Sequence, residues 1–143
     1  MGAFDIFKIS ASGMKAQRKR MDIAASNLAN VQTTNTEEGG PYRKKDVVFK
    51  AADVSDDKSF SGTLSKKVEG VEIDSVKESD KPFQLVYNPS HPDANSEGYV
   101  TFPNVNLMEE MTDMTAAARA YEANVNVLNT TKDMFLKTLD LIK

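Results

Sequence analysis

The sequence predicts an α+β fold in which long N- and C-terminal heptad helices pair as a coiled coil and bracket a small β-rich insert. At both ends of the chain, apolar residues recur at alternating intervals of four and three, which is typical of coiled-coil helices. Short β-branched and aromatic runs, bounded by Gly, Pro, Ser and Asp, lie between the two ends and are typical of strands. We therefore expect an N-terminal helix and joint at 1–33, an insert at 34–103 and a C-terminal helix at 104–143.

The C-terminal segment carries the longer heptad pattern. Pro103 and Asn104 suit the start of a helix, and Glu109 and Glu110 complement the helix dipole in its first turns. At roughly 1.5 Å per residue, this helix would be about 60 Å long. Its apolar stripe, in which Lys132 takes one position, is expected to be an assembly seam. The apolar members of this seam are Leu107, Met111, Met114, Ala118, Tyr121, Val125, Leu128, Phe135, Leu139 and Ile142.

The N-terminal segment repeats the pattern over a shorter length. Its seam consists of Phe7, Met14, Met21 and Leu28, with Ala11, Arg18 and Ala25 at the intervening positions. Gly13 weakens the helix by about 1 kcal/mol but allows a close backbone approach. Because the alanines bury little area, the two helices alone are expected to be marginally stable and to gain from neighbouring chains. The basic residues around this seam favour a solvated or partner-facing surface over a membrane-bound one.

The first helix is expected to end within the stretch SNLANVQTT, residues 26–34. Helices commonly end at a glycine or shortly before a proline, yet neither residue type occurs after this helix until Gly39. The stretch instead contains the polar residues Asn27, Asn30, Thr33 and Thr34. It could be a binding site, a plain loop or a joint that another part of the chain holds in place.

The insert contains three runs that are typical of strands. They are YRKKDVVFKA at 42–51, KVEGVEIDSV at 67–76 and PFQLVYN at 82–88. The segment DVSDDKSFSG, residues 53–62, is polar enough to be a mobile loop. The prolines fall at or outside the ends of the expected elements. The sequence therefore predicts a small β-rich unit between the helices.

Composition excludes several classes of function. The net charge of -3 argues against a general nucleic-acid binder, and the absence of cysteine excludes disulfides, thiolate catalysis and cysteine zinc sites. The N-terminus lacks the unbroken apolar core of a secretory signal, and no run approaches the length of a membrane span. If the protein leaves the cytoplasm, we expect it to use a route without a cleaved signal peptide.

The best candidate for chemistry surrounds the only histidine, His91, in NPSHPDANSEG. The first half of an EF-hand calcium loop is matched by Asp93, Asn95, Glu97 and Gly98. The match then fails because the twelfth position is Asn104 rather than Glu, and the flanking prolines forbid the incoming helix. An Asx-rich turn is the better interpretation. The sequence therefore predicts no enzyme, no catalytic or metal-binding residue, no cofactor and no small-molecule substrate.

Three stretches resemble a known family. ISASGMKAQRKRMDIAASNLANVQTT is similar to the N-terminal signature of the bacterial flagellar rod, hook and axial proteins. GGPYRKKDVVF and YNPSHPDANSEGYVTFPNVNLMEEMTDMTAAARAYEANVNVL resemble rod members of that family. The resemblance implies a structural subunit of the proximal rod of the flagellar basal body. It also implies that Asn27, Asn30, Thr33 and Thr34 form the joint where the axial helix passes into the insert.

The family resemblance also implies partners and a location. Such subunits are type III export substrates that pass unfolded through the flagellar export apparatus without a cleaved signal peptide and assemble in the periplasm. They stack helically with other rod proteins and with copies of themselves, next to the basal-body ring near the membrane, and transmit torque. The resemblance implies neither a nucleic-acid partner nor a small-molecule substrate.

Two other interpretations predict different behaviour. A cytoplasmic coiled-coil adaptor would form a small closed oligomer, whereas a rod subunit needs heterologous contacts that remain open. A metal-dependent enzyme centred on His91 would need further ligands, which the sequence does not show.

Overall fold

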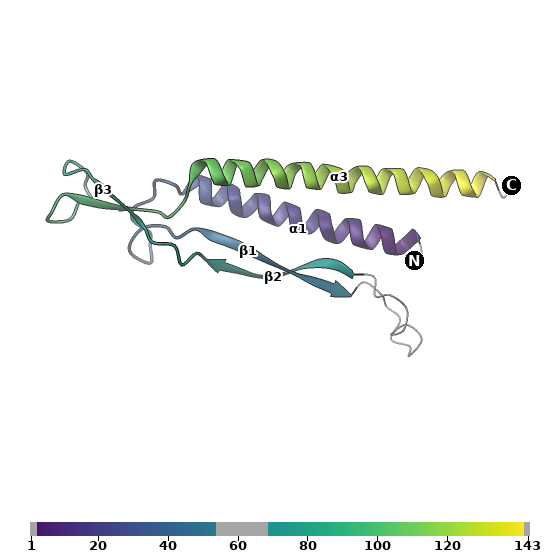
Figure 1. Cartoon of the computed structure of the whole chain (residues 1–143), viewed down its shortest axis with the longest axis horizontal. Helices are drawn as coiled ribbons and strands as arrows, with labels where there is room; N and C mark the ends of the chain where they lie inside the picture. The colour runs from purple at the N-terminus through teal and green to yellow at the C-terminus, as the bar shows by residue number, and fades with distance from the viewer. Residues whose placement is uncertain (1–2, 54–68, 142–143) are drawn as a thin grey trace.

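The computed structural model describes residues 3–53 and 69–141 and has two long terminal helices around a small antiparallel β insert (Figure 1). This arrangement confirms the predicted α+β fold class. Its elements are α1 (Ala3–Ala29), β1 (Lys45–Asp53), β2 (Glu69–Glu78), β3 (Gln84–Tyr87), β4 (Tyr99–Phe102) and α3 (Leu107–Asp140). The expected seam residue Ile142 and, apart from Asp53, the expected polar loop at 53–62 lie outside the described residues.

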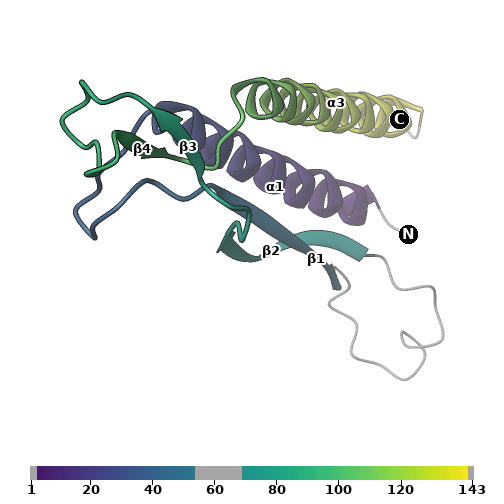
Figure 2. The same cartoon turned by 60° about the vertical axis from the view of Figure 1, so that its left-hand side comes forward.

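The elements form an elongated molecule in three layers (Figures 1 and 2). Helix α1 is the middle layer, with the antiparallel helix α3 on one side and the β1–β2 hairpin on the other. The β3–β4 hairpin lies at the opposite end of the molecule from the C-terminus and projects beyond the helices. Within the described part of the chain, neither helix combines the length and apolar character needed to cross a membrane.

Strands β1 and β2 pair in antiparallel register from Lys45 opposite Glu78 to Asp53 opposite Glu69. The register shifts between Val48 and Phe49, and such a bulge increases the local twist of a ribbon. Strand β1 begins three residues later than its pattern predicts, and the first two residues of the second predicted run, 67 and 68, lie outside the described residues. Helix α1 holds the hairpin through the Ser12 hydroxyl, which accepts a hydrogen bond from the backbone N–H of Val71 at 3.1 Å.

Strands β3 and β4 form a second, separate hairpin from Gln84 opposite Phe102 to Tyr87 opposite Tyr99. The sequence predicts β3 but not β4, because YVTF is only four residues long and directly follows a run of turn-forming residues. Gly98 precedes β4 with a φ of +82°, and a Cβ there would lie 2.9 Å from the ring of Tyr87. The turn therefore requires a glycine.

Helix α3 begins at Leu107, three residues later than its expected start at Asn104. The N-cap is Asn106, whose side chain accepts hydrogen bonds from the backbone N–H groups of Met108 and Glu109. Packing between α3 and α1 is close, because a Cβ on Gly13 would lie 3.0 Å from Nδ2 of Asn124. The close contact at Gly13 is therefore with the Asn124 side chain, rather than the backbone approach that the sequence predicts.

The apolar core of the described residues is small. Its buried members are Ala16, Ala24, Val100, Val105 and Ala117. The buried polar and charged residues are more conspicuous and are Ser10, Asn27, Lys44, Ser79, Asn104 and Glu110. Most of these polar residues meet where the helices join the insert, so polar contacts rather than a large apolar core determine that part of the fold.

Candidate functional site

Helix α1 ends without a glycine because Asn30 caps it. The backbone N–H of Asn30 donates to the carbonyl oxygen of Ser26 at 3.2 Å, and its side-chain Nδ2 donates to the same oxygen at 2.9 Å. The hydroxyl of Thr33 then donates to Oδ1 of Asn30 at 3.2 Å. These bonds satisfy a helix-end carbonyl that a glycine motif would otherwise satisfy.

Asn27 is the centre of the junction between the helices and the insert, with 1% of its surface exposed. Its Nδ2 donates to the carbonyl oxygen of Lys45 and to Oε2 of Glu110, both at 2.9 Å. Its Oδ1 accepts from the backbone N–H of Lys45 at 2.9 Å and from the hydroxyl of Tyr42 at 3.0 Å. One buried amide therefore joins α1, the start of β1 and the first turn of α3.

A buried ion pair lies beside this amide. Nζ of Lys44 is 2.7 Å from Oε1 of Glu110, and the two side chains are 9% and 3% exposed. Asp46 and Glu109 are more distant from the same ammonium, at 3.6 and 4.0 Å, and both are about half exposed. Glu110 is therefore the principal partner of Lys44, and its second carboxylate oxygen is held by Asn27.

The charge of Lys44 is favoured by this pairing. Burial lowers the pKa of Lys44, but the hydrogen bond and negative charge of Glu110, followed by the charges of Asp46 and Glu109, outweigh that effect. The pKa of Lys44 is consequently raised above its ordinary value of 10.5. The junction contains a charged pair, held in a largely water-excluded position.

Asn104 completes the junction from the side of the β3–β4 hairpin. Its Oδ1 accepts from the backbone N–H of Lys44 at 2.8 Å, and its Nδ2 donates to the carbonyl oxygens of Ser79 and Lys81 at 3.3 and 2.8 Å. Arg43 also donates to the carbonyl of Ser79, at 3.0 Å. Because its side chain binds three separated backbone groups, Asn104 fixes the chain before α3 rather than starting that helix.

The two threonines of the expected joint contact the insert. The carbonyl of Thr33 accepts from the backbone N–H of Tyr42 at 3.0 Å, and the hydroxyl of Thr34 donates to a carboxylate oxygen of Asp93 at 2.6 Å. With Asn27 and Asn30, all four joint residues therefore lie where α1 passes into the insert. Asp93 belongs to the loop of the β3–β4 hairpin, so Thr34 ties that hairpin to the end of α1.

The sequence did not identify Tyr42, Lys44, Asn104 and Glu110 as junction residues. Glu110 offered one signal, because it is a charged residue next to the seam position Met111 on a helix expected to bury its apolar face. Its partners lie far away in the sequence, so this signal could not identify them. We define the junction as Asn27, Tyr42, Lys44, Asn104 and Glu110.

The expected seam residues occupy two environments. Those that are half-buried by the chain itself are Phe7, Met14, Met21, Leu28, Met114, Tyr121, Val125 and Leu128. Those that remain more exposed are Leu107 and Met111, both 47%, Phe135 at 44% and Leu139 at 49%. The described part of the seam is thus divided between the intramolecular helix contact and the open surface of α3.

The rotation of α3 explains this division. Glu110 and Ala117 are the residues of α3 that are buried, and Asn124 lies against Gly13 of α1. These three positions repeat every seven residues, and each lies one residue before a position of the expected seam. The ion pair draws Glu110 inward, so part of the apolar stripe is turned away from α1.

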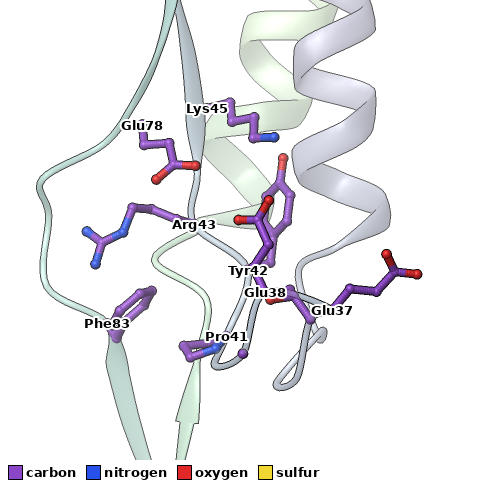
Figure 3. A pocket seen from close by; sticks show the side chains of 10 residues that line it. Glu37, Glu38, Pro41, Tyr42, Arg43, Lys45, Glu78 and Phe83 are labelled. Carbon is purple, nitrogen blue, oxygen red and sulfur yellow. The ribbon is translucent and has the colours of Figure 1, made fainter.

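A hollow of about 450 Å³ lies beside the junction, between the loop before β1 and the end of β2 (Figure 3). Arg43 extends along it, with its guanidinium carbon 4.4 Å from the centre of the Phe83 ring. Glu78 is on the strand side, whereas the side chain of Glu37 points away. Arg43 is engaged with Phe83 and the Ser79 carbonyl, and these contacts connect the loop before β1 to the residues after β2.

The segment around His91 forms a turn. Oδ1 of Asn95 accepts from the backbone N–H groups of Glu97 and Tyr99 at 3.0 and 2.9 Å, as the Asx-turn interpretation predicts. Nδ1 of His91 accepts from the backbone N–H of Asp93 at 3.1 Å. Within residues 3–53 and 69–141, no group of three or more His, Cys, Asp or Glu residues is placed to hold a metal ion.

Two family models match the helical ends of the chain. The one described as flagella basal body rod protein matches residues 7–35, and the one described as flagellar basal body rod FlgEFG protein C-terminal matches residues 96–141. The whole chain is 43% identical to the flagellar basal-body rod protein FlgC of Bacillus subtilis, with 100% of both chains covered. The chain belongs to the FlgC family.

Further FlgC relatives match over nearly their full length. Identity is 39% to the FlgC of Borreliella burgdorferi, covering 100% of this chain and 99% of the relative. It is 43% to the FlgC of Salmonella typhimurium, covering 99% and 98%. The ranges matched by the two family models include Asn27, Asn104 and Glu110, whereas Lys44 lies in the FlgC-family segment between them.

Proposed function

We propose that this chain is a structural subunit of the proximal rod of the flagellar basal body, where it packs helically with other rod proteins and further copies of itself. Membership of the FlgC family supports this role, because its relatives are flagellar basal-body rod proteins that match over their whole length. The structural observation that carries the proposal is the apolar surface that the fold leaves open on α3.

This surface lies at both ends of α3. The heptad residues Leu107 and Met111 at its start, and Phe135 and Leu139 at its end, keep 44 to 49% of their surface exposed although α1 and α3 are already packed together. Exposed apolar patches often mark protein–protein contacts. Neighbouring rod subunits would bury this stripe, and the same contacts would stabilise a helix pair that has few buried apolar residues of its own.

The junction is suited to transmitting torque. Asn27 and Glu110 connect α1, β1 and α3 through bonds in which both partners are largely buried. Buried networks whose members are all satisfied restrict movement. A force applied to the insert would therefore be passed to both helices rather than absorbed by bending at a flexible joint.

The small core also fits export in an unfolded state. Three of the five buried apolar residues in the described ranges are alanines, so little apolar burial opposes unfolding. On this proposal the chain passes through the flagellar type III export apparatus without a cleaved signal peptide. It then folds fully as it assembles in the periplasm, next to the basal-body ring near the membrane, and performs no catalysis.

The test is to place a charge in the open stripe. Met111→Asp and Leu139→Asp should be exported and folded but should be lost from isolated basal bodies, because a carboxylate would have to be desolvated at the subunit contact. Asn129→Asp is the matched control, since it adds the same charge to an exposed position outside the seam with little change of shape. Normal incorporation of both seam variants would contradict the proposal.

Purified protein distinguishes the alternative function. A coiled-coil adaptor would form a closed oligomer of fixed size, and Met111→Asp would dissociate that oligomer. A rod subunit should not form such a species, because its contacts are open and involve other proteins. Sedimentation equilibrium of the full chain and of the Met111→Asp variant would decide between them.

A further inference from the structure

The β3–β4 hairpin presents an open apolar face at one end of the molecule. Directly paired residues of antiparallel strands lie on the same face, so Leu85 and Thr101 share a face with the pair Tyr87 and Tyr99. Leu85 is 68% exposed, Tyr87 64% and Tyr99 42%. On the other face, Val100 is completely buried, whereas Val86 is 44% exposed. The face with Leu85 and Tyr87 is therefore the more open one.

The hairpin also lacks the features that usually prevent an exposed strand from pairing with another chain. Neither QLVY nor YVTF contains a charged residue or a proline, and their pairing is regular. A ribbon of two strands is at best marginally stable in water without further packing. Tyrosine pairs such as Tyr87 and Tyr99, whose ring centres are 5.3 Å apart, are common at protein interfaces. These features favour a partner on the open face.

A second apolar surface lies at the opposite end of the molecule. The contacts of Asn27 with Glu110 and of Gly13 with Asn124 fix the antiparallel offset, so the last turns of α3 run past the start of α1 (Figure 1). The exposed apolar residues there are Met134, Phe135, Leu136, Leu139 and Leu141. They are interspersed with the charged residues Lys132, Asp133, Lys137 and Asp140, so apolar surface is exposed on more than one side of this helix end.

We propose that the open hairpin face, formed by Leu85, Tyr87 and Tyr99, docks the exposed end of α3 from a second copy of this chain, the next along the rod. This inference rests on the proposed function. The segment that the hairpin receives is residues 132–141 of that copy, which carries both exposed apolar residues and charged residues.

Shape and charge both favour this occupant. The two apolar surfaces lie at opposite ends of an elongated molecule, so joining them gives a heterologous contact that can be extended, whereas a hairpin–hairpin contact would close a dimer. The hairpin strands carry no charge. The charges in the helix end balance, as Lys132 and Lys137 are matched by Asp133 and Asp140. Neither surface therefore repels the other.

Photo-crosslinking in isolated basal bodies tests the contact. The full chain would carry p-benzoylphenylalanine in place of Tyr87, and crosslinked peptides would be identified by mass spectrometry. We expect an adduct with residues 132–141 of another copy of this chain. An adduct with any other segment, or a yield no higher than from the same group at Gln84 on the opposite face, would overturn the proposal.

Charge substitutions provide a second measurement. Leu85→Glu combined with Tyr87→Glu should reduce incorporation into basal bodies at least tenfold, whereas Gln84→Glu should leave it unchanged. Wild-type swimming by the double variant would overturn the contact. If the chain is present in basal bodies but crosslinks elsewhere, only this inference fails. If the unaltered chain is missing from basal bodies, the proposed function fails too.

Discussion

The two ends of α3 differ in how their side chains are buried. At its start, Glu110 is 2% exposed and finds all its partners within the same chain, from Lys44 and Asn27. At its end, Phe135 and Leu139 remain close to half exposed and the helix runs past α1. The buried carboxylate at the first end finds its partners within the monomer, although Leu107 and Met111 nearby stay 47% exposed. On the proposed function, a neighbouring subunit covers the apolar residues of the second end.

This difference assigns separate tasks to polar and apolar residues. Polar groups with fixed geometry hold the helices and the insert in one arrangement, because each must meet a specific partner to offset its desolvation. The apolar stripe is less specific and can be buried by another subunit. Substitutions at the junction should therefore change the stability of the monomer, and substitutions in the open stripe should change assembly.

The largest expected effect comes from removing the buried carboxylate. Glu110→Ala leaves the ammonium of Lys44 without its main partner, and breaking one side of a buried ion pair costs about 3 to 5 kcal/mol of unfolding free energy. Urea denaturation of the purified chain would measure it. Glu109→Gln is the control, since its carboxylate is half exposed and 4.0 Å from Lys44, and its loss should cost less than about 1 kcal/mol. Equal effects would contradict the junction account.

Asn27→Ala should have a smaller but clear effect. It removes the donors to Glu110 and to the Lys45 carbonyl, and it leaves the Lys45 N–H without its acceptor. We expect a loss of about 2 to 3 kcal/mol, because buried groups without partners cost about 1 to 3 kcal/mol each and some will relax toward water. The same denaturation assay applies, and a change below about 0.5 kcal/mol would show that Asn27 is not the centre of the junction.

Alkaline pH should destabilise the junction less than these two substitutions do, because the neutral amine of Lys44 can still donate a hydrogen bond to Glu110. The pKa of Lys44 is higher in the folded chain than its ordinary value of 10.5. The ion pair therefore contributes fully below about pH 10.5, and that contribution is lost as the pH rises through the raised folded pKa. Unfolding free energies measured from pH 9 to 12 should fall in the native chain. Lys44→Met should lack this component, and identical slopes in the two proteins would contradict the assignment.

The smallest effect is expected at His91, away from both ends of α3. Its ring lies against Phe102 with 6.1 Å between ring centres, and its Nδ1 accepts one backbone hydrogen bond in a turn. His91→Ala should cost less than about 1 kcal/mol and leave swimming unchanged. Calorimetric titration with Zn²⁺ or Ca²⁺ offers an independent check. Specific binding that disappears in the variant would revive the metal-site interpretation.

The sequence predicts the periodic parts of this fold well and its long-range polar contacts poorly. Heptad spacing found both helices, because each repeat is local and extends over many residues. The stretch with Asn27, Asn30, Thr33 and Thr34 is also recognisable from the sequence, because a helix end without Gly or Pro is unusual and is a local feature. The partners of Asn27 were not, since Lys45 and Glu110 lie 18 and 83 residues away and nothing local marks them.

The sequence also fails to predict strand β4 and the start of α3, and both differences have physical causes. Strand β4 is only four residues long, which is too short for a recognisable alternating pattern, although Val100 within it is completely buried. Helix α3 starts late because Asn104 binds backbone groups of the insert and Asn106 takes the capping position. In both places tertiary contacts outweigh the local signal, which is why sequence patterns locate elements more reliably than their boundaries.

Amide hydrogen exchange tests the contrast between the two ends of α3 most directly. It would be measured in the free chain and in isolated basal bodies that contain it. We predict that in the free chain the amides of residues 110–124 exchange slowly while those of 132–140 exchange fast, and that assembly slows the second group strongly. If residues 132–140 are as protected as 110–124 in the free chain, or still exchange fast in the assembled rod, the helix end does not depend on a neighbouring subunit.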